Sequence, residues 1–408
     1  MFQRRLPDSL RHDPTPGVRG FAILSAFEST ARGILISVYP VTIYRAFQST
    51  ETVSEIYLVI GFLSFLFALS TPWISMYVPR RWLYTISAIS LMAGALLAAV
   101  GSPWFIAAGL SLMTVSTVVI TVCFNAYVMD YISRSRLGEV ESMRLFYSGA
   151  AWTIGPVLGV WLMDWWQPAP FLVSALASLV LLAVFWTLRL GNGKVIARAR
   201  SKPPNPLAFI FVFLKQPRLI TGWTFAVVRS SGWWVYIVYV PIFAVENGFS
   251  EQLGGIALSI SNGLLFITPL ILKWINGRVR YALKVGFIGA GIFFLLAAIL
   301  AFNASVAILL LIGASFFLIM LDVSAGLPFL MAVKPSQRTE MSAVYATYRD
   351  VSGIIAPGVA RLTLLFAPLA AVFIATAAGL FATAVLANRL HPRLGKTKPV
   401  PAKQDIRL

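Results

Sequence analysis

Charged residues, cysteine and histidine are all scarce in this sequence of 408 residues. Asp, Glu, Lys and Arg make up 12% of the chain, whereas a typical soluble domain carries roughly 25% charged residues. At the same time, 58% of the residues are hydrophobic and the mean hydropathy is +0.81. Such a composition cannot cover a water-soluble surface, so most of the chain must be surrounded by lipid.

The missing residue types also exclude several kinds of chemistry. The single cysteine, Cys123, lies within an apolar run and cannot form an intramolecular disulfide. The two histidines, His12 and His391, lie outside the apolar runs, so no Cys/His cluster is placed to bind zinc. No Gly-x-x-x-x-Gly-Lys-Ser/Thr motif is present, so ATP is not expected as the energy source. We therefore expect no metal, no cofactor and no enzymatic activity.

Acidic residues are outnumbered by basic residues, 15 to 33, which gives a net charge of +18. The basic residues lie in short loops between apolar runs and not in a soluble basic fold, so nucleic-acid binding is not expected. The first 18 residues are polar and basic and lack the apolar core of a secretory signal. The first apolar run is therefore expected to stay in the membrane as an uncleaved anchor.

Twelve apolar runs are long enough to cross a bilayer, which takes about 20 residues in a helix. Because lipid-exposed backbone must satisfy its own hydrogen bonds, runs of this length predict helices and not barrel strands. The predicted spans are residues 20–47, 54–78, 82–100, 104–130, 144–166 and 169–190 in the first half, and 218–245, 251–274, 281–302, 305–331, 340–366 and 367–390 in the second.

The cations alternate between loops along the chain. One set of loops and both termini are basic, whereas the other set is nearly free of cations: Arg45 is the cation noted there, and the other charged residues are acidic. By the positive-inside rule this pattern predicts that both termini are cytoplasmic. The predicted organisation is a tail at 1–18, a six-helix bundle at 19–190, a linker at 191–217 with a short interfacial helix at 207–214, a second bundle at 218–390 and a tail at 391–408.

A weak internal repeat relates the two halves. At an offset of 201 residues, Pro40 aligns with Pro241 and Pro156 aligns with Pro357. Prolines and charges are rare inside apolar helices, so these coincidences are informative. At one repeat-related position the charges are opposite, because Glu28 aligns with Arg229. Internal repeats with a site between them are typical of secondary transporters.

Three local motifs resemble those of the major facilitator superfamily. Residues 155–159, Gly-Pro-Val-Leu-Gly, resemble the Gly-Pro-x-x-Gly core of the fifth-helix motif, which is found mostly in exporters. Residues 214–218, Leu-Lys-Gln-Pro-Arg, resemble the lead into helix seven, and Pro79-Arg80-Arg81 resembles the basic end of the motif in loop 2–3. The Gly and Asp that normally precede that basic pair are absent, and no helix-four arginine is present. Proton antiport therefore does not follow from the resemblance.

The resemblance implies an all-α membrane fold of twelve helices in two pseudo-symmetric six-helix bundles. It further implies a monomeric secondary transporter in a bacterial inner membrane, which moves a small organic solute by alternating access. Abundant aromatic residues on the predicted cavity helices favour proton-coupled export of an amphiphilic or drug-like compound. Uptake of a small anionic metabolite held by Arg32 and Arg229 is an alternative. A non-transporting membrane enzyme or scaffold on the same fold is another.

Six ionisable residues stand out in or near the interiors of the predicted spans, where a charge is costly and normally faces a partner or a water-filled cavity. Glu28 and Arg32 share one helix face. They form either a structural bridge or a cavity site in which Glu28 is the proton or cation switch, with Arg32 and Arg229 as counter-charges. Asp322 and Arg349 lie at matching depths and form either a structural bridge or a gate. The six candidate residues for substrate or proton binding are Glu28, Arg32, Arg229, Asp322, Arg349 and Asp350.

A second group of residues is expected to act in gating. Asp130 lies at the cytoplasmic end of the fourth span and is expected to pair with loop arginines such as Arg80 or Arg81, either as a latch or simply as a solvated helix end. Gly-Pro-x-x-Gly sequences allow close helix approach and bending, which favours a gating helix or a simple kink. The residues concerned are Gly155, Pro156 and Gly159, with Pro357 as the repeat-related twin.

Overall fold

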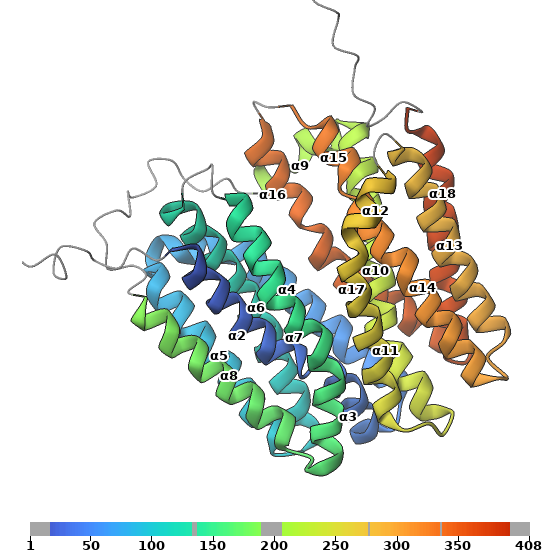
Figure 1. The fold of residues 1–408 in the computed structure, drawn as a ribbon, viewed down its shortest axis with the longest axis horizontal. Coiled ribbons are helices and arrows are strands. Elements are labelled where there is room, and N and C mark those ends of the chain that lie inside the picture. Colours follow the sequence, from blue (N-terminus) through green and yellow to red (C-terminus); the bar gives the residue numbers. More distant parts are fainter. Residues whose placement is uncertain (1–16, 133–136, 189–205, 276–277, 335–336, 392–408) are drawn as a thin grey trace, which may run out of the picture.

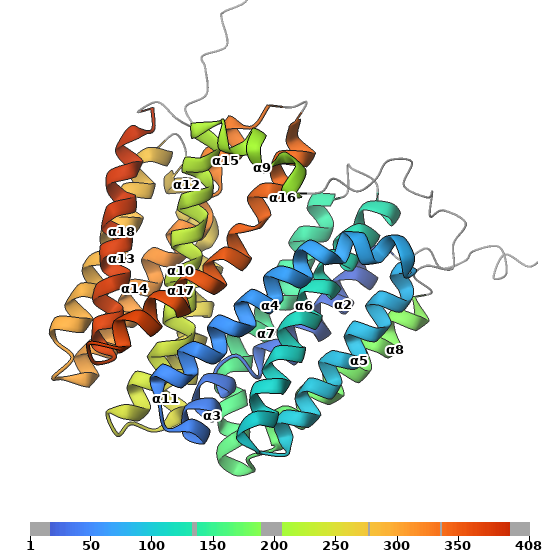
Figure 2. The ribbon, with the colours of Figure 1, turned by 180° about the vertical axis from the view of Figure 1, so that it is seen from behind.

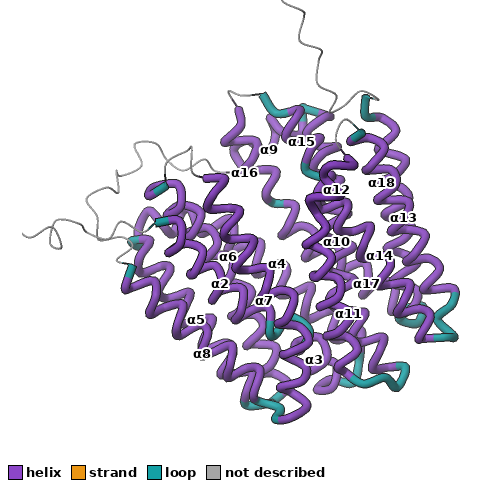
Figure 3. Tube along the Cα trace, viewed as in Figure 1, coloured by secondary structure: helices purple, strands orange, loops and turns teal. Residues whose placement is uncertain are grey.

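The computed structural model describes residues 17–132, 137–188, 206–275, 278–334 and 337–391. Within these ranges the regular elements are all helices joined by short loops (Figure 3). Ten helical segments there are long and apolar enough to cross a membrane, and α7 (Leu137–Trp165) and the pair α16–α17 complete the twelve predicted spans. The predicted all-α fold class is confirmed. The predicted tails and most of the predicted linker lie outside the described residues.

The first bundle follows the predicted spans closely. Its first span is interrupted by a turn at residues 34–37, which divides it into two helices. The bundle is formed by α2 (Val18–Gly33), α3 (Val38–Phe47), α4 (Thr50–Tyr77), α5 (Arg80–Ala99), α6 (Pro103–Tyr131), α7 and α8 (Ala169–Thr187).

Three spans of the second bundle are broken, which the sequence pattern did not predict. Pro328 falls at the start of α15, where its missing N–H and fixed φ suit a helix beginning but end the preceding helix. The elements are α10 (Pro217–Glu246), α11 (Glu251–Gly263), η2 (Leu264–Ile267), α12 (Thr268–Ile275), α13 (Val279–Ile299), α14 (Ala304–Ser324), α15 (Leu327–Ala332), α16 (Arg338–Ala346), α17 (Tyr348–Leu364), α18 (Ala370–Leu386) and η4 (Ala387–Arg389).

The short segment before the second bundle is also helical. Helix α9 (Pro206–Leu214) lies beside the start of α10 at the upper end of the molecule in Figure 1. Phe213 of α9 is buried with Phe329 and Met341, so this helix packs on α15 and α16. Helix α9 coincides with the helix expected at 207–214, while its placement in the membrane interface stays a prediction.

The two bundles meet along two pairs of helices. Helix α4 of the first bundle packs on α17 of the second, and α7 of the first packs on α11 of the second. Both views show the bundles converging at the lower end, near α3 and α11, and diverging toward α9 and α16 at the upper end (Figures 1 and 2). The repeat-related residues Pro156 and Pro357 each lie on a helix that contacts the opposite bundle.

Glycines allow these contacts to be close. A Cβ at Gly255 of α11 would lie 2.7 Å from the Pro156 carbonyl oxygen. A Cβ at Gly61 of α4 would collide with the Gly353 carbonyl of α17. Within the first bundle, Gly155 and Gly159 meet the backbone of Gly33 and Ile34 in the same way. Gly155, Pro156 and Gly159 thus lie where helix backbones approach closely, while their role in gating stays a prediction.

Pro156 also creates a polar contact between the bundles. Because proline has no backbone N–H, the Trp152 carbonyl one turn earlier loses its helical donor. The Asn262 side chain of α11 donates to this carbonyl at 2.8 Å. The neighbouring Val157 N–H donates to the Ser259 hydroxyl of α11 at 3.1 Å. The carbonyl that Pro156 leaves without a helical donor is therefore satisfied by a side chain of the opposite bundle.

Replacing Gly159 with Ala is expected to destabilise the protein, because the new methyl group would collide with the Ile34 carbonyl. Overpacking of this kind costs about 1–3 kcal/mol. The measurement is the unfolding temperature of detergent-purified protein. Gly149→Ala on the same helix is the matched control, since a Cβ there meets nothing within 4 Å. Equal unfolding temperatures for the two variants would contradict the close approach.

Candidate functional site

A cavity of about 730 Å³ lies between the two bundles. Helices α2, α4, α6 and α7 line it from the first bundle, and α10, α11, α14 and α17 line it from the second. A cavity of this volume is within the range of small-molecule sites, which are usually concave and mostly apolar with a few polar groups.

Aromatic and polar side chains both face the cavity. Trp234 stands edge-on to Tyr57 of the opposite bundle, with ring centroids 6.2 Å apart. Asn125 and several threonines of α6 supply polar surface. The aromatic lining residues are Tyr39, Tyr57, Trp152, Trp233, Trp234 and Tyr348. Such a lining suits an amphiphilic ligand with a flat apolar portion, because aromatic faces attract both apolar groups and cations.

Glu28 and Arg32 of α2 form the expected ion pair, with 2.8 Å between Glu28 Oε1 and Arg32 Nη1. The Arg32 guanidinium lies 5.1 Å from the Trp152 ring centroid and faces the cavity. The Glu28 side chain is 15% exposed and is not part of the cavity wall. Its contact with the cavity runs through Arg32.

Arg229 of α10 pairs with Asp322 of α14, with Nη1 and Oδ1 2.9 Å apart. The other Asp322 oxygen accepts a hydrogen bond from Trp233 Nε1 at 2.9 Å. The prediction that Arg229 is a counter-charge of Glu28 is therefore wrong. The predicted Asp322–Arg349 bridge is wrong as well. Sequence spacing indicates the depth of Asp322 in the membrane but not which neighbouring helix its side chain faces. In the structure it faces α10.

Arg349 and Asp350 of α17 face the cavity without a close ionic partner. Arg349 Nε donates to the Tyr348 hydroxyl at 3.2 Å. Among the side chains that the structure describes, no carboxylate lies within 4 Å of the Arg349 guanidinium and no cation lies within 4 Å of the Asp350 carboxylate. The Ser64 hydroxyl of α4 lies close to Asp350 across the interface.

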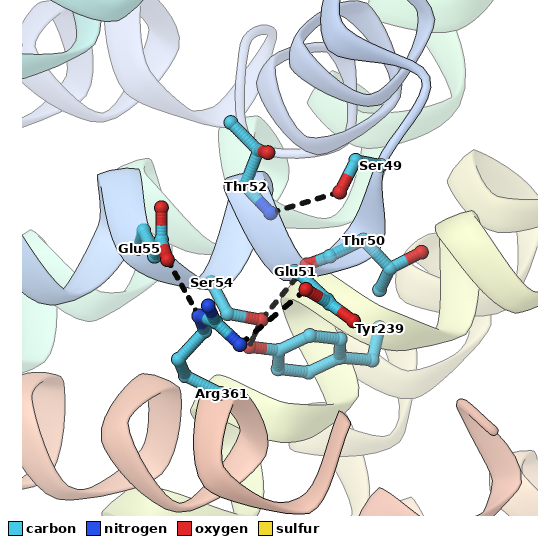
Figure 4. Close-up of polar contacts among 8 residues, drawn as sticks. All are labelled: Ser49, Thr50, Glu51, Thr52, Ser54, Glu55, Tyr239 and Arg361. Carbon is cyan, nitrogen blue, oxygen red and sulfur yellow. Dashed lines mark hydrogen bonds and ion pairs between the residues drawn. The ribbon is translucent and has the colours of Figure 1, made fainter. Parts of the chain in front are cut away.

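A cluster of polar contacts ties the bundles together at the lower end (Figure 4). Arg361 of α17 lies between two glutamates of α4, at 2.6 Å from Glu55 and 3.4 Å from Glu51. The hydroxyls of Ser54 and Tyr239 are 2.7 Å apart. We call Glu51, Glu55 and Arg361 the lower gate.

Two further contacts between the bundles lie beside the lower gate. Thr50 donates to Glu246 of α10, and Arg45 pairs with Glu251 of α11. Polar contacts that link the bundles are therefore concentrated at this end of the cavity.

Arg361 was not among the site residues predicted from the sequence. A usable signal was present, because Glu51 and Glu55 are spaced to share a helix face at the start of the second span. Arg361 is a lone cation near the end of a span that finishes on the same side of the membrane. These three residues have complementary charge at similar depth.

The residues predicted to gate the other end are only partly described. Helix α5 begins at Arg80, and the Arg81 guanidinium lies 5.9 Å from the Trp82 ring centroid. The side chain of Asp130 is outside the described residues, so its pairing stays a prediction. Pro357 lies inside α17, four residues before Arg361 of the lower gate.

Comparison with known proteins is consistent with this architecture. The family model described as Major Facilitator Superfamily matches residues 21–357. No curated protein gives a significant sequence match. The solved structure of the nucleoside transporter NupG is similar to this chain with a TM-score of 0.69 and 14% identity, covering 93% of this chain and 99% of that one.

A POT family transporter in complex with 5-aminolevulinic acid is similar with a TM-score of 0.75 and 11% identity, covering 94% of this chain and 97% of that one. At these identities the structural likeness concerns the fold alone. The family model covers most of the chain, including α3 to α8 and all of α2 from residue 21 onward. The chain therefore belongs to the major facilitator superfamily of membrane transporters.

Proposed function

We propose that this protein is a secondary transporter that moves a small organic solute by alternating access. The observation that carries the proposal is a charged, aromatic-lined cavity between the bundles whose polar ties gather at one end, at the lower gate. Opening that gate while the upper ends close would expose the same residues to the other side. Small displacements of packed bundles can produce this exchange.

The distribution of charge supports a cavity that faces the cytoplasm in this state. Lys273, Arg278 and Lys334 lie at helix ends away from the lower gate, whereas four glutamates and two arginines form the contacts of the lower gate and of the two pairs beside it. By the positive-inside rule the gate side is extracytoplasmic. A monomer in a bacterial inner membrane with cytoplasmic termini is part of the same proposal.

The ion pairs support coupling to protons. Glu28 and Asp322 each hold an arginine that also faces the cavity. Protonation of either carboxylate would release its arginine, and a change in the contacts of a cavity cation would alter the affinity for solute. Coupling of this type requires two sites that influence one another's binding free energy.

Aromatic side chains on both walls and the exporter-like Gly-Pro-x-x-Gly sequence favour export of an amphiphilic or drug-like compound. The alternative, uptake of an anionic metabolite, was based on Arg32 and Arg229. Both are already bonded to carboxylates, so Arg349 is the better anion anchor for that alternative. NupG, a nucleoside transporter, and the POT family transporter with bound 5-aminolevulinic acid show that similar folds accommodate small polar solutes.

Side-specific labelling tests the transport cycle directly. A Cys123→Ala background removes the only cysteine, and Thr121→Cys places a new thiol in the cavity wall. We expect a membrane-impermeant maleimide to label this thiol in inside-out vesicles but poorly in intact cells. Adding Arg361→Ala should raise labelling in intact cells, because the lower gate loses its only arginine.

The control for this experiment is Arg389→Ala, which removes an arginine at the end of the last helix, outside the lower gate. It should leave labelling unchanged from both sides. Strong labelling from outside in the Thr121→Cys parent would contradict a closed extracytoplasmic end. Unchanged labelling after Arg361→Ala would show that these ion pairs do not hold the gate closed.

Removing Arg229 alone is expected to lower the unfolding temperature, because the Asp322 carboxylate, 29% exposed, would lose its counter-charge. The cost should be at most about 3 kcal/mol, since part of the group is hydrated. The double variant Arg229→Met/Asp322→Leu should recover stability, because two apolar side chains can replace a buried pair. We expect it to remain inactive in transport; recovered transport would make the pair purely structural.

Glu28→Gln tests proton coupling. The amide keeps the size of the side chain but cannot ionise, so solute-driven proton movement into proteoliposomes should be lost while the protein stays folded. The readout is the fluorescence of enclosed pyranine after addition of amphiphilic cations, anions and zwitterions. Asp164→Asn is the matched control, because Asp164 is exposed and does not line the cavity, and the asparagine oxygen can still accept the hydrogen bond from Gln252. Unchanged proton movement in Glu28→Gln would exclude Glu28 as the coupling group.

A further inference from the structure

We propose that the cavity binds a zwitterion: a small amphiphilic solute whose anionic group contacts Arg349 and whose cationic group contacts Asp350. This inference rests on the proposed transport function and names the substrate class of the same cavity. It follows from which charged groups the protein has already paired and which it has left open to the cavity.

Five charged residues line the cavity and a sixth, Glu28, lies behind Arg32; four of these six groups are bonded in pairs. Arg32 is bonded to Glu28 at 2.8 Å, and Arg229 is bonded to Asp322 at 2.9 Å. Asp322 also accepts from Trp233. Removing one member of such a pair strands a charge in a poorly hydrated environment. While both carboxylates are ionised, as in this state, the four groups are therefore expected to keep their partners when a ligand binds. The Arg229–Asp322 pair joins α10 to α14, whereas the Glu28–Arg32 pair lies within α2.

Arg349 is the guanidinium that remains available. It lines the cavity, its side chain is exposed there, and among the described side chains no carboxylate lies within 4 Å of it. Its Nε is used by the Tyr348 hydroxyl, and its guanidinium lies 5.8 Å from the Tyr348 ring centroid. The orientation of the group is thus set by Tyr348, while its terminal N–H groups are free to bind a planar anion such as a carboxylate.

Asp350 is the matching free carboxylate. It follows Arg349 in the chain and lines the same cavity, beside Ser64 of the opposite bundle. Consecutive residues on a helix project about 100° apart, so the two groups can face one ligand without bonding to each other. No ion pair within 4 Å joins them in the part of the chain that the structure describes.

The net charge of the cavity, when it is closed on both sides, favours a zwitterion over an ion of one sign. The cavity and its paired groups carry three arginines (32, 229 and 349) and three carboxylates (28, 322 and 350), which sum to zero. A zwitterion keeps this sum at zero and pairs both open groups. A monoanion would leave Asp350 uncompensated, and a monocation would leave Arg349 uncompensated, when the cavity is closed on both sides. An uncompensated charge in a dry interior is costly.

The rest of the wall fits the uncharged part of such a ligand. Trp234 and Tyr57 come together from opposite bundles near Gly353 of α17, one turn after Asp350. Trp152 of α7 also lines the cavity, with its ring centroid 5.1 Å from the Arg32 guanidinium. An aromatic or apolar side group can pack against these rings while the two charged groups reach α17.

The test uses purified full-length protein and three matched probes on each of two scaffolds. The zwitterions are L-phenylalanine and the dipeptide Phe-Phe, the cations are their C-terminal amides, and the anions are their N-acetyl forms. The dipeptide separates the two charges further than the amino acid does. We expect a zwitterion of one scaffold to raise the unfolding temperature more than its amide or its N-acetyl form, since a ligand of the native state stabilises it.

Two variants must then change the charge preference. In Arg349→Gln the zwitterion should lose affinity by about tenfold or more, the loss expected for a charged hydrogen bond, and should bind no better than the amide. In Asp350→Asn it should bind no better than the N-acetyl form. Each variant should thus lose a different part of the preference for the zwitterion, which a merely destabilised protein would not do. Arg389→Gln and Asp164→Asn, outside the cavity, should retain the wild-type preference.

Several outcomes would overturn the inference. Equal stabilisation by the zwitterion and the N-acetyl form in wild type would assign the site to anions, and equal stabilisation by the amide would assign it to cations. If none of the six probes stabilises the protein, the zwitterion site is rejected. Labelling of Thr121→Cys that still responds to Arg361→Ala would then leave the transport cycle standing, whereas failure of both experiments would reject the transport function as well.

Discussion

Each polar group inside a lipid-embedded bundle has to find its partner within the protein, and the arrangement of the cavity depends on this constraint. It explains why Pro156 is tolerated in α7: the carbonyl it leaves without a donor is bonded by Asn262 of the other bundle. It also explains why Arg229 and Asp322 occur together on facing helices. The same constraint makes the exceptions informative, because Arg349 and Asp350 are open only toward the cavity.

The weak repeat in the sequence corresponds to a repeated interface. Pro156 on α7 and Pro357 on α17 are 201 residues apart, and each lies on a helix that packs against the opposite bundle. A glycine allows the backbones to approach closely at each interface: Gly255 of α11 contacts α7, and Gly61 of α4 contacts α17. Matched, closely packed contacts on two sides of a cavity allow one bundle to rock against the other while both remain intact.

Most of the fold could be predicted from the sequence. In lipid, a long apolar run has to satisfy its own backbone hydrogen bonds, and a helix does so. The candidate site could be predicted only in part. The Glu28–Arg32 pair followed from helical spacing, whereas the partner of Asp322 depended on how α14 is rotated, which spacing does not determine. The helix breaks at Thr268 and Pro328 and the role of Arg361 needed the packing of neighbouring helices. Charges on different helices can be matched in depth from sequence, but not in direction.

Helix α17 links the two ends of the cavity. It begins at Tyr348, carries Arg349 and Asp350 in its first turn, and carries Arg361 twelve residues after Arg349, a distance of about 18 Å along a helix. Pro357 lies between them. A ligand that displaces the first turn of α17 would therefore also displace Arg361, which bonds Glu51 and Glu55. How far Arg361 moves would depend on how much α17 bends at Pro357.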